Sequence, residues 1–121
     1  MVHIGTTFNI IDNTGVKKIL WIGISNSKSK IIKIGDIIVG IVKQSTKSKH
    51  FKKSMIIKAL VIRIKKPFNL KTGFSYKFKD NAAILVDKYN NPIGTRIFGV
   101  VPKYFKENSY FKIITLTNNF I

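Results

Sequence analysis

The sequence predicts a mainly β fold, either a β-barrel or a β-sandwich. The chain has 121 residues, and its β-branched apolar runs are short and repeatedly broken by Gly, Asn, Asp or Pro. Many short strands joined by turns are typical of these two architectures. Hydrophobic residues make up 45% of the chain, which is ordinary for a packed core and too high for a disordered basic tail. The length fits one domain, which we expect to cover residues 1–121.

Two strands joined by a tight turn are predicted near the N-terminus. The first covers residues 7–11, and residues 17–24 form its partner. Between them, residues 12–15 combine Asp and Asn side chains with Gly15, which suits a turn that needs a positive φ.

Two basic loops flank the next predicted strand. Residues 26–30 are polar and basic, and residues 47–53 form a second loop of the same kind. Gly35 and Asp36 mark the entry to a strand over residues 37–42.

The longest apolar run, residues 55–64, is predicted to be a central strand. It is rich in Ile and Val and does not alternate with polar residues, which is typical of a strand buried on most of its length. Residues 65–67 (Lys-Lys-Pro) end it, because Pro has no backbone N–H to donate to a neighbouring strand.

Three further strands are predicted in the second half. Residues 74–79 alternate between aromatic and polar or basic, as in a strand with one buried face. A second strand is expected at residues 82–86, a turn at 89–92, and the last strand at 94–101. Beyond Pro102, we expect one or two helical turns, because Pro suits the first turn of a helix.

The charge of the chain indicates a polyanionic partner. It has 22 Lys and Arg against 5 Asp and Glu, a formal net charge of +17. We expect nucleic acid and no membrane, because no apolar run reaches the ~18 residues of a spanning helix and no broad apolar helix face is present. The lysines expected to meet phosphates gather mainly in loops and turns: Lys17, Lys18, Lys28, Lys30, Lys33, Lys47, Lys49, Lys52, Lys53, Lys65, Lys66 and Lys71.

Catalysis, metal binding and cofactors are not expected. The chain has no cysteine, and its two histidines have no companion carboxylate at a ligand spacing. It also has no Gly-rich phosphate-binding loop. Asp12, Asp36 and Asp80 adjoin turn residues, where a carboxylate closes a turn.

Aromatic residues fall into two predicted groups. The alternating Phe74, Tyr76 and Phe78 are expected in the core, as a barrel interior requires. Phe51 and Phe68 are surrounded by lysines, so they are the better candidates for stacking on unpaired bases.

Three segments resemble the L-fourteen family of large-subunit ribosomal proteins. They are residues 12–18, a block that runs from residues 59–62 through 78–84, and residues 92–99. Their order and spacing match the family across essentially the whole chain, and Gly-Thr-Arg-Ile-Phe-Gly at residues 94–99 is the most telling match.

The resemblance implies a five-stranded β-barrel, at about residues 1–101, with a projecting β-hairpin and a small C-terminal helical part at about 102–121. It implies a non-enzymatic constituent of the large ribosomal subunit that binds large-subunit rRNA, stabilises its fold and contributes to an intersubunit bridge. The implied partners are a neighbouring ribosomal protein of the L-nineteen family, small-subunit rRNA across the bridge, and a ribosome-silencing factor.

The resemblance also assigns residues to faces. Lys17 and Lys18 match a basic turn of the family that lies against rRNA. Thr95 and Arg96 match its motif near the face that meets the small subunit, and we expect Lys103 on the same face and Arg96 to contact rRNA as well.

The alternative hypothesis is a free-standing regulatory RNA-binding β-barrel module, which would exchange among many RNAs independently of ribosomes. The heavy use of Lys, Ile, Asn and Phe follows A/T-rich codons, and the first residues do not resemble a targeting segment. These features favour an organelle-encoded protein, for which we expect the mitochondrial matrix, with the plastid stroma as the alternative.

Overall fold

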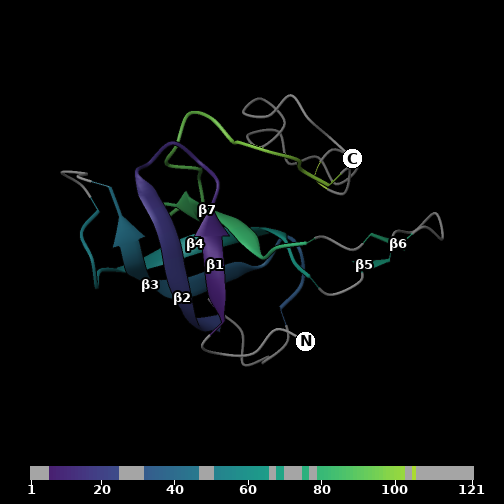
Figure 1. The fold of residues 1–121 in the computed structure, drawn as a ribbon, viewed down its shortest axis with the longest axis horizontal. Helices are drawn as coiled ribbons and strands as arrows, with labels where there is room; N and C mark the ends of the chain where they lie inside the picture. Colours follow the sequence, from purple (N-terminus) through teal and green to yellow (C-terminus); the bar gives the residue numbers. More distant parts are fainter. Residues whose placement is uncertain are drawn as a thin grey trace.

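A computed structural model gives the architecture and describes residues 6–24, 32–46, 51–65, 68–69, 75–76, 79–102 and 105. Five strands close into a barrel in the order β1-β2-β3-β4-β7 (Figure 1). The barrel strands are β1 (Thr7–Ile10), β2 (Val16–Ile24), β3 (Ile37–Ser45), β4 (Ile56–Arg63) and β7 (Ala82–Val86). The mainly β prediction is therefore confirmed, and the architecture is a barrel.

The barrel is closed by one parallel pair. β1 lies parallel to β7, with Asn9 opposite Ala82, and every other neighbouring pair is antiparallel. The parallel pairing continues past β1, because the Ile11 N–H donates to the Ala83 carbonyl at 3.1 Å. Closure leaves no unpaired edge on the five strands, which removes the usual route to edge-to-edge association.

The core fills the barrel and extends outside it. β1 alternates between exposed and buried side chains, so Phe8 and Ile10 point inward. Trp21 is the largest fully buried side chain, and its indole N–H donates to the Gly23 carbonyl at 2.8 Å. The buried indole therefore keeps a hydrogen bond, as burial of a polar group requires.

β7 and the second half of β4 are buried on both faces. In β4 four consecutive residues, from Ala59 to Ile62, are at most 5% exposed, and all of β7 is buried. A barrel interior covers only one face of a strand, so other segments must cover the second. Ile34 and Val101 belong to the same hydrophobic cluster, which indicates that the flanking segments supply this cover. The strand predicted at residues 55–64 is confirmed as β4, but only its second half is buried as expected, and Ile56 is 68% exposed.

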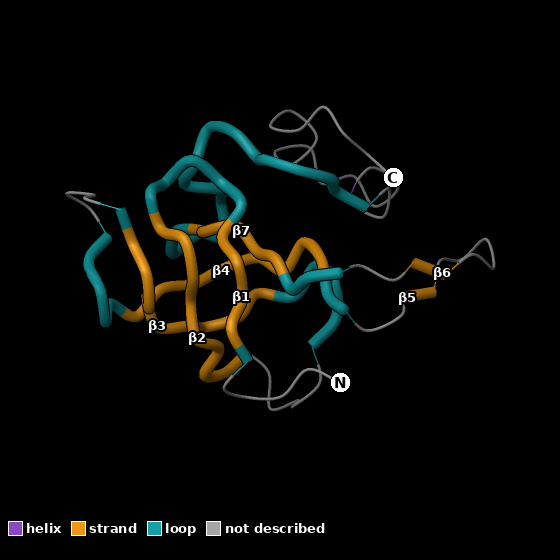
Figure 2. The backbone as a smooth tube through the Cα atoms, in the orientation of Figure 1, coloured by secondary structure: helices purple, strands orange, loops and turns teal. Residues whose placement is uncertain are grey.

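The projecting hairpin is present as a separate two-stranded sheet. β5 (Phe68–Asn69) pairs antiparallel with β6 (Ser75–Tyr76), and the pair lies away from the barrel (Figures 1 and 2). The predicted strand at residues 74–79 is thus described only as β6, and Lys79 lies in a bend. The predicted burial of the aromatic side chains of that strand lies outside the described residues.

The expected strand at residues 94–101 is wrong. This segment contains only isolated bridging residues, among them Ile97, which pairs with Asp12. The physical reason is that β1 and β7 already pair with each other, so no strand edge remains for another partner. Gly99 also has a φ of 81°, which no regular strand contains. Of the expected C-terminal helical part, Phe105 is the one helical residue that the structure describes.

Candidate nucleic-acid interface

The turn between β1 and β2 is held by a buried carboxylate. Asp12 is 8% exposed and accepts hydrogen bonds from the Thr14 hydroxyl at 2.6 Å and the Thr14 N–H at 3.2 Å. Its other oxygen accepts the Leu85 N–H at 2.9 Å, which ties the turn to β7. Gly15 completes the turn with a φ of 97°, as predicted. Asp12 thus has a structural role that extends beyond the turn itself.

Asn13 fixes the Thr95–Arg96 turn against the same structure. Its Oδ1 accepts the backbone N–H groups of Thr95, at 2.9 Å, and of Arg96, at 3.3 Å. Its Nδ2 donates to the Thr95 hydroxyl at 2.8 Å. Two segments that lie 82 residues apart in the sequence are thereby joined, and the Thr95 and Arg96 side chains stay exposed.

Position 94 must be a glycine because its backbone lies very close to the β1–β2 turn. A Cβ at this position would lie 2.8 Å from Asn13 Oδ1 and 3.1 Å from the Asp12 Cβ. Both neighbours are already held by the hydrogen bonds of the turn, so neither can move without loss. The glycine that opens the Gly-Thr-Arg-Ile-Phe-Gly segment thus lets the Thr95–Arg96 turn reach Asn13.

We expect Gly94→Ala to destabilise the protein by about 1–3 kcal/mol, because an added methyl must displace the Asn13 side chain. The free energy of unfolding, measured in urea, checks this. Gly23→Ala is the matched control, since a Cβ there meets nothing within 4 Å and should cost little. Equal stability of the two variants would contradict the close approach at Gly94.

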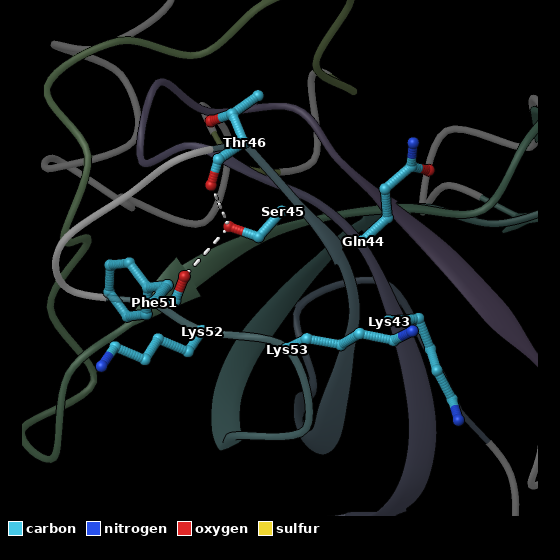
Figure 3. Close-up of a pocket in the computed structure, with 7 residues that line it drawn as sticks. All are labelled: Lys43, Gln44, Ser45, Thr46, Phe51, Lys52 and Lys53. Carbon is cyan, nitrogen blue, oxygen red and sulfur yellow. Dashed lines mark hydrogen bonds between the residues drawn. The ribbon is translucent and has the colours of Figure 1, made fainter.

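The end of β3 is bonded to the same turn. The Gly15 carbonyl accepts from the Thr46 N–H at 2.8 Å and from the Thr46 hydroxyl at 2.9 Å. The Ser45 hydroxyl oxygen lies 2.9 Å from the Thr46 carbonyl and 3.0 Å from the Phe51 carbonyl (Figure 3). The β1–β2 turn, the end of β3 and the segment before β4 therefore form one continuous surface.

Two irregularities in strand register place lysines outward on this surface. The pairs Val16–Ser45 and Lys18–Gln44 are separated by an extra residue on β2, which is Lys17. The next step, to Ile19–Val42, leaves Lys43 as the extra residue on β3. A bulge interrupts the alternation of faces, and as a result Lys17 and Lys18 are both exposed although they are adjacent.

Three lysine residues line a shallow depression beside these strands. Lys43 lines it together with Lys52 and Lys53, and Thr46 and Phe51 contribute to its wall (Figure 3). All three lysines are exposed. We name Lys17, Lys18, Lys43, Lys52 and Lys53 the lysine cluster.

The structure divides the predicted contact residues between the two ends of the barrel. Lys17, Lys18, Lys52 and Lys53 gather at the end where β2 begins and β3 ends. Arg96 joins this end through Asn13. The remaining predictions fall outside the described residues: Lys28, Lys30, Lys47, Lys49, Lys66, Lys71 and Lys103.

Lys33 and Lys65 lie at the opposite end. The Lys33 N–H donates to Asp36 Oδ2 at 2.7 Å in the turn that leads into β3, confirming a turn-closing role for Asp36. Lys65 follows β4, and its N–H donates to Asn81 Oδ1 at 2.9 Å. Both side chains are exposed, but they are separated from the lysine cluster by the length of the barrel.

Asp80, which was predicted to close a turn, forms an ion pair with a distant arginine. Its Oδ2 accepts the Arg63 Nη2 at 3.2 Å, and the Arg63 guanidinium also lies against Gly99. Arg63 is mostly buried, so this arginine packs inside the fold.

Lys43 was not predicted as a contact residue, and the stacking role predicted for Phe51 differs from its place in the structure. Lys43 follows an apolar run and has no lysine next to it in the sequence, and only the bulge and the approach of the segment before β4 bring it beside other lysines. Phe51 is half-buried and packs against the hydrophobic core, so the structure does not favour the predicted stacking role. The side chain of Phe68 lies outside the described residues.

Sites of other kinds do not emerge in the described part of the chain. There, no three His, Cys, Asp or Glu side chains gather where a metal ion could be held. No helix among these residues is long and apolar enough to cross a membrane.

Comparison with known proteins gives one consistent family. The family model described as ribosomal protein L14p/L23e matches residues 1–121. The chain is 49% identical to large ribosomal subunit protein uL14c of Eimeria tenella over 121 residues, covering all of both chains. It is 42% identical to large ribosomal subunit protein uL14c of Toxoplasma gondii, again over 121 residues and all of both chains.

Proposed function

Because this chain belongs to the ribosomal protein L14p/L23e family and is a structural constituent of the large ribosomal subunit, we propose that its lysine cluster binds large-subunit rRNA. We propose further that the Thr95–Arg96 turn faces the small subunit and takes part in an intersubunit bridge. The family is structural, and the role proposed here involves no catalysis.

One observation carries this proposal. The end of the barrel that carries the β1–β2 turn presents the exposed side chains of the lysine cluster, and Asn13 bonds the exposed Thr95–Arg96 turn to the same structure. Lysines read phosphate charge rather than base identity, which suits a protein seated on a folded RNA backbone. The rigid attachment suits a bridge, because a contact between two large particles needs a fixed position.

The protein neighbours follow from the same placement. We propose that a ribosomal protein of the L-nineteen family lies beside this chain and that small-subunit rRNA meets the Thr95–Arg96 turn. A ribosome-silencing factor that occupied this turn would prevent subunit joining, since both would use the same exposed side chains.

The organelle is proposed from the relatives. An organellar ribosome is supported, and both relatives carry the name uL14c, in which the suffix denotes the chloroplast type. We therefore propose a plastid ribosome. The mitochondrial location expected from composition is not supported, because codon bias reports an A/T-rich genome and does not distinguish one organelle from another.

Sedimentation tests the proposed function. The tagged full-length protein should migrate with the large subunit of plastid ribosomes in moderate salt and should dissociate as salt rises. Recovery of the protein only in ribosome-free fractions, bound to many different RNAs, would instead support the free-standing RNA-binding module.

The bridge has a separate test. We expect Arg96→Ala to weaken subunit joining by about tenfold, the size of one lost charge-assisted contact, and to reduce incorporation into large subunits much less, because the lysine cluster remains intact. Light scattering or gradient sedimentation of purified subunits measures the association. Lys33→Ala removes a cation from the opposite end of the barrel and serves as the control. Unchanged joining in Arg96→Ala would contradict the orientation proposed for this turn.

A further inference from the structure

We propose that a second depression, beside the β1–β2 turn, holds one unpaired nucleotide of RNA, with its base stacked on Phe98. This inference rests on the proposed function, because it names how RNA is held at one point of the same surface. Asn9, Lys17, Thr46 and Phe98 are among the residues that line the depression.

Phe98 is an exposed aromatic ring in a fixed position. It is 47% exposed, whereas its neighbour Ile97 is 6% exposed and anchors the segment in the core. The Phe98 N–H donates to the Ile11 carbonyl at 2.7 Å, which holds the backbone against the end of β1. An exposed ring on a fixed backbone presents a flat apolar surface on which another planar group can stack.

The surroundings of the ring favour a base as that partner. The Arg96 guanidinium carbon lies 5.4 Å from the centroid of the Phe98 ring, so a cation already stacks on it. Aromatic rings combined with Arg are the stacking elements of proteins that hold unpaired bases. An apolar protein segment would make no use of this cation.

Two polar residues of the depression are already engaged within the protein. Asp12 and Asn13 both line it. The Asp12 carboxylate accepts hydrogen bonds from Thr14 and Leu85, and Asn13 Oδ1 accepts the backbone N–H groups of the Thr95–Arg96 turn. These side chains therefore shape the depression, and the contacts with a nucleotide must come from other residues.

Asn9 and Lys17 supply the groups that remain available in this depression. The Asn9 side chain is exposed, and within the part of the chain that the structure describes its carboxamide has no hydrogen-bond partner. A carboxamide has both donors and an acceptor, which match the edge of a base. The Lys17 ammonium, exposed on the bulge of β2, suits the phosphate of the same nucleotide. An exposed ring, an amide that is not engaged within the described part of the protein and a cation therefore line a single depression.

Stacking can be measured directly with the full-length protein and a short single-stranded RNA that contains 2-aminopurine, whose fluorescence falls when the base stacks. We expect the wild-type protein to quench it. Phe98→Leu should abolish the quenching and weaken binding by about five- to 150-fold, the range for loss of one stacked base. Lys17→Gln should reduce the salt dependence of binding instead.

Tyr89→Leu is the matched control. Tyr89 is 69% exposed, and the Lys88 ammonium lies 5.0 Å from the centroid of its ring, but Tyr89 does not line the depression. Equal quenching and affinity in wild type, Phe98→Leu and Tyr89→Leu would overturn the nucleotide site while leaving the proposed function intact. A wild-type protein that fails to bind RNA in any salt-dependent way would overturn both. Urea unfolding of Phe98→Leu checks that the variant is folded.

Discussion

Replacing the lysine cluster (Lys17, Lys18, Lys43, Lys52 and Lys53) by glutamine is expected to flatten the salt dependence of RNA binding severely. Each phosphate contact adds roughly 0.7 to 0.9 to the slope of log affinity against log salt, so five contacts account for roughly 3.5 to 4.5. The fold should persist, because all five side chains are exposed. Filter binding of large-subunit rRNA across a salt series measures the slope.

A control variant separates local contact from general charge. Glutamine at three exposed lysines of the opposite end, Lys33, Lys65 and Lys79, lowers the net charge without touching the cluster. We expect a much smaller change of slope for each lysine replaced. An equal change for each lysine in both variants would mean that RNA senses the total charge of the protein and not one end of the barrel.

The second large effect is expected at Asp12. Asp12→Ala removes the acceptor of three hydrogen bonds and leaves the buried Leu85 N–H without a partner, which should cost about 3 kcal/mol of the free energy of unfolding. Asp12→Asn keeps one of the two acceptor oxygens and should lose less. Thermal or urea unfolding of the full chain measures both variants.

Asp87→Ala is the control for this second effect. Asp87 Oδ1 accepts the Tyr89 N–H at 2.8 Å and the Asn91 N–H at 3.0 Å, but both bonds stay within one local turn. We expect a loss of about 1 kcal/mol, because water can replace the carboxylate at an exposed turn. If Asp12→Ala were no more destabilising than Asp87→Ala, the tie between the first turn and β7 would carry little of the stability.

The barrel strands were predictable because their signals are local. The alternation around Phe8 and the Ile-rich run before Arg63 each determine a strand, and Gly15 marks the turn by its need for a positive φ. The segment at residues 94–101 misled the prediction because its β-branched residues look like a strand. Such residues form a strand only where a neighbouring strand has a free edge. The pairing of β1 with β7 closes the barrel and leaves no such edge.

The candidate site was predictable in part. Lys17, Lys18, Lys52 and Lys53 could be named from charge and resemblance, whereas Lys43 depends on a register shift that no local pattern reveals. Phe98 was not predicted as a stacking residue for a similar reason. Its exposure depends on the pairing of Ile97 with Asp12 and on the hydrogen bond from the Phe98 N–H to the Ile11 carbonyl.

The sequence by itself determined the class of fold, the polyanionic partner and the family, because composition, alternation and motif order are properties of the chain. Only the tertiary structure decided which lysines share one end of the barrel and that Asn13 holds the Thr95–Arg96 turn. The physical reason is that these relations join residues up to 82 positions apart, through hydrogen bonds and strand register that exist only once the barrel has closed.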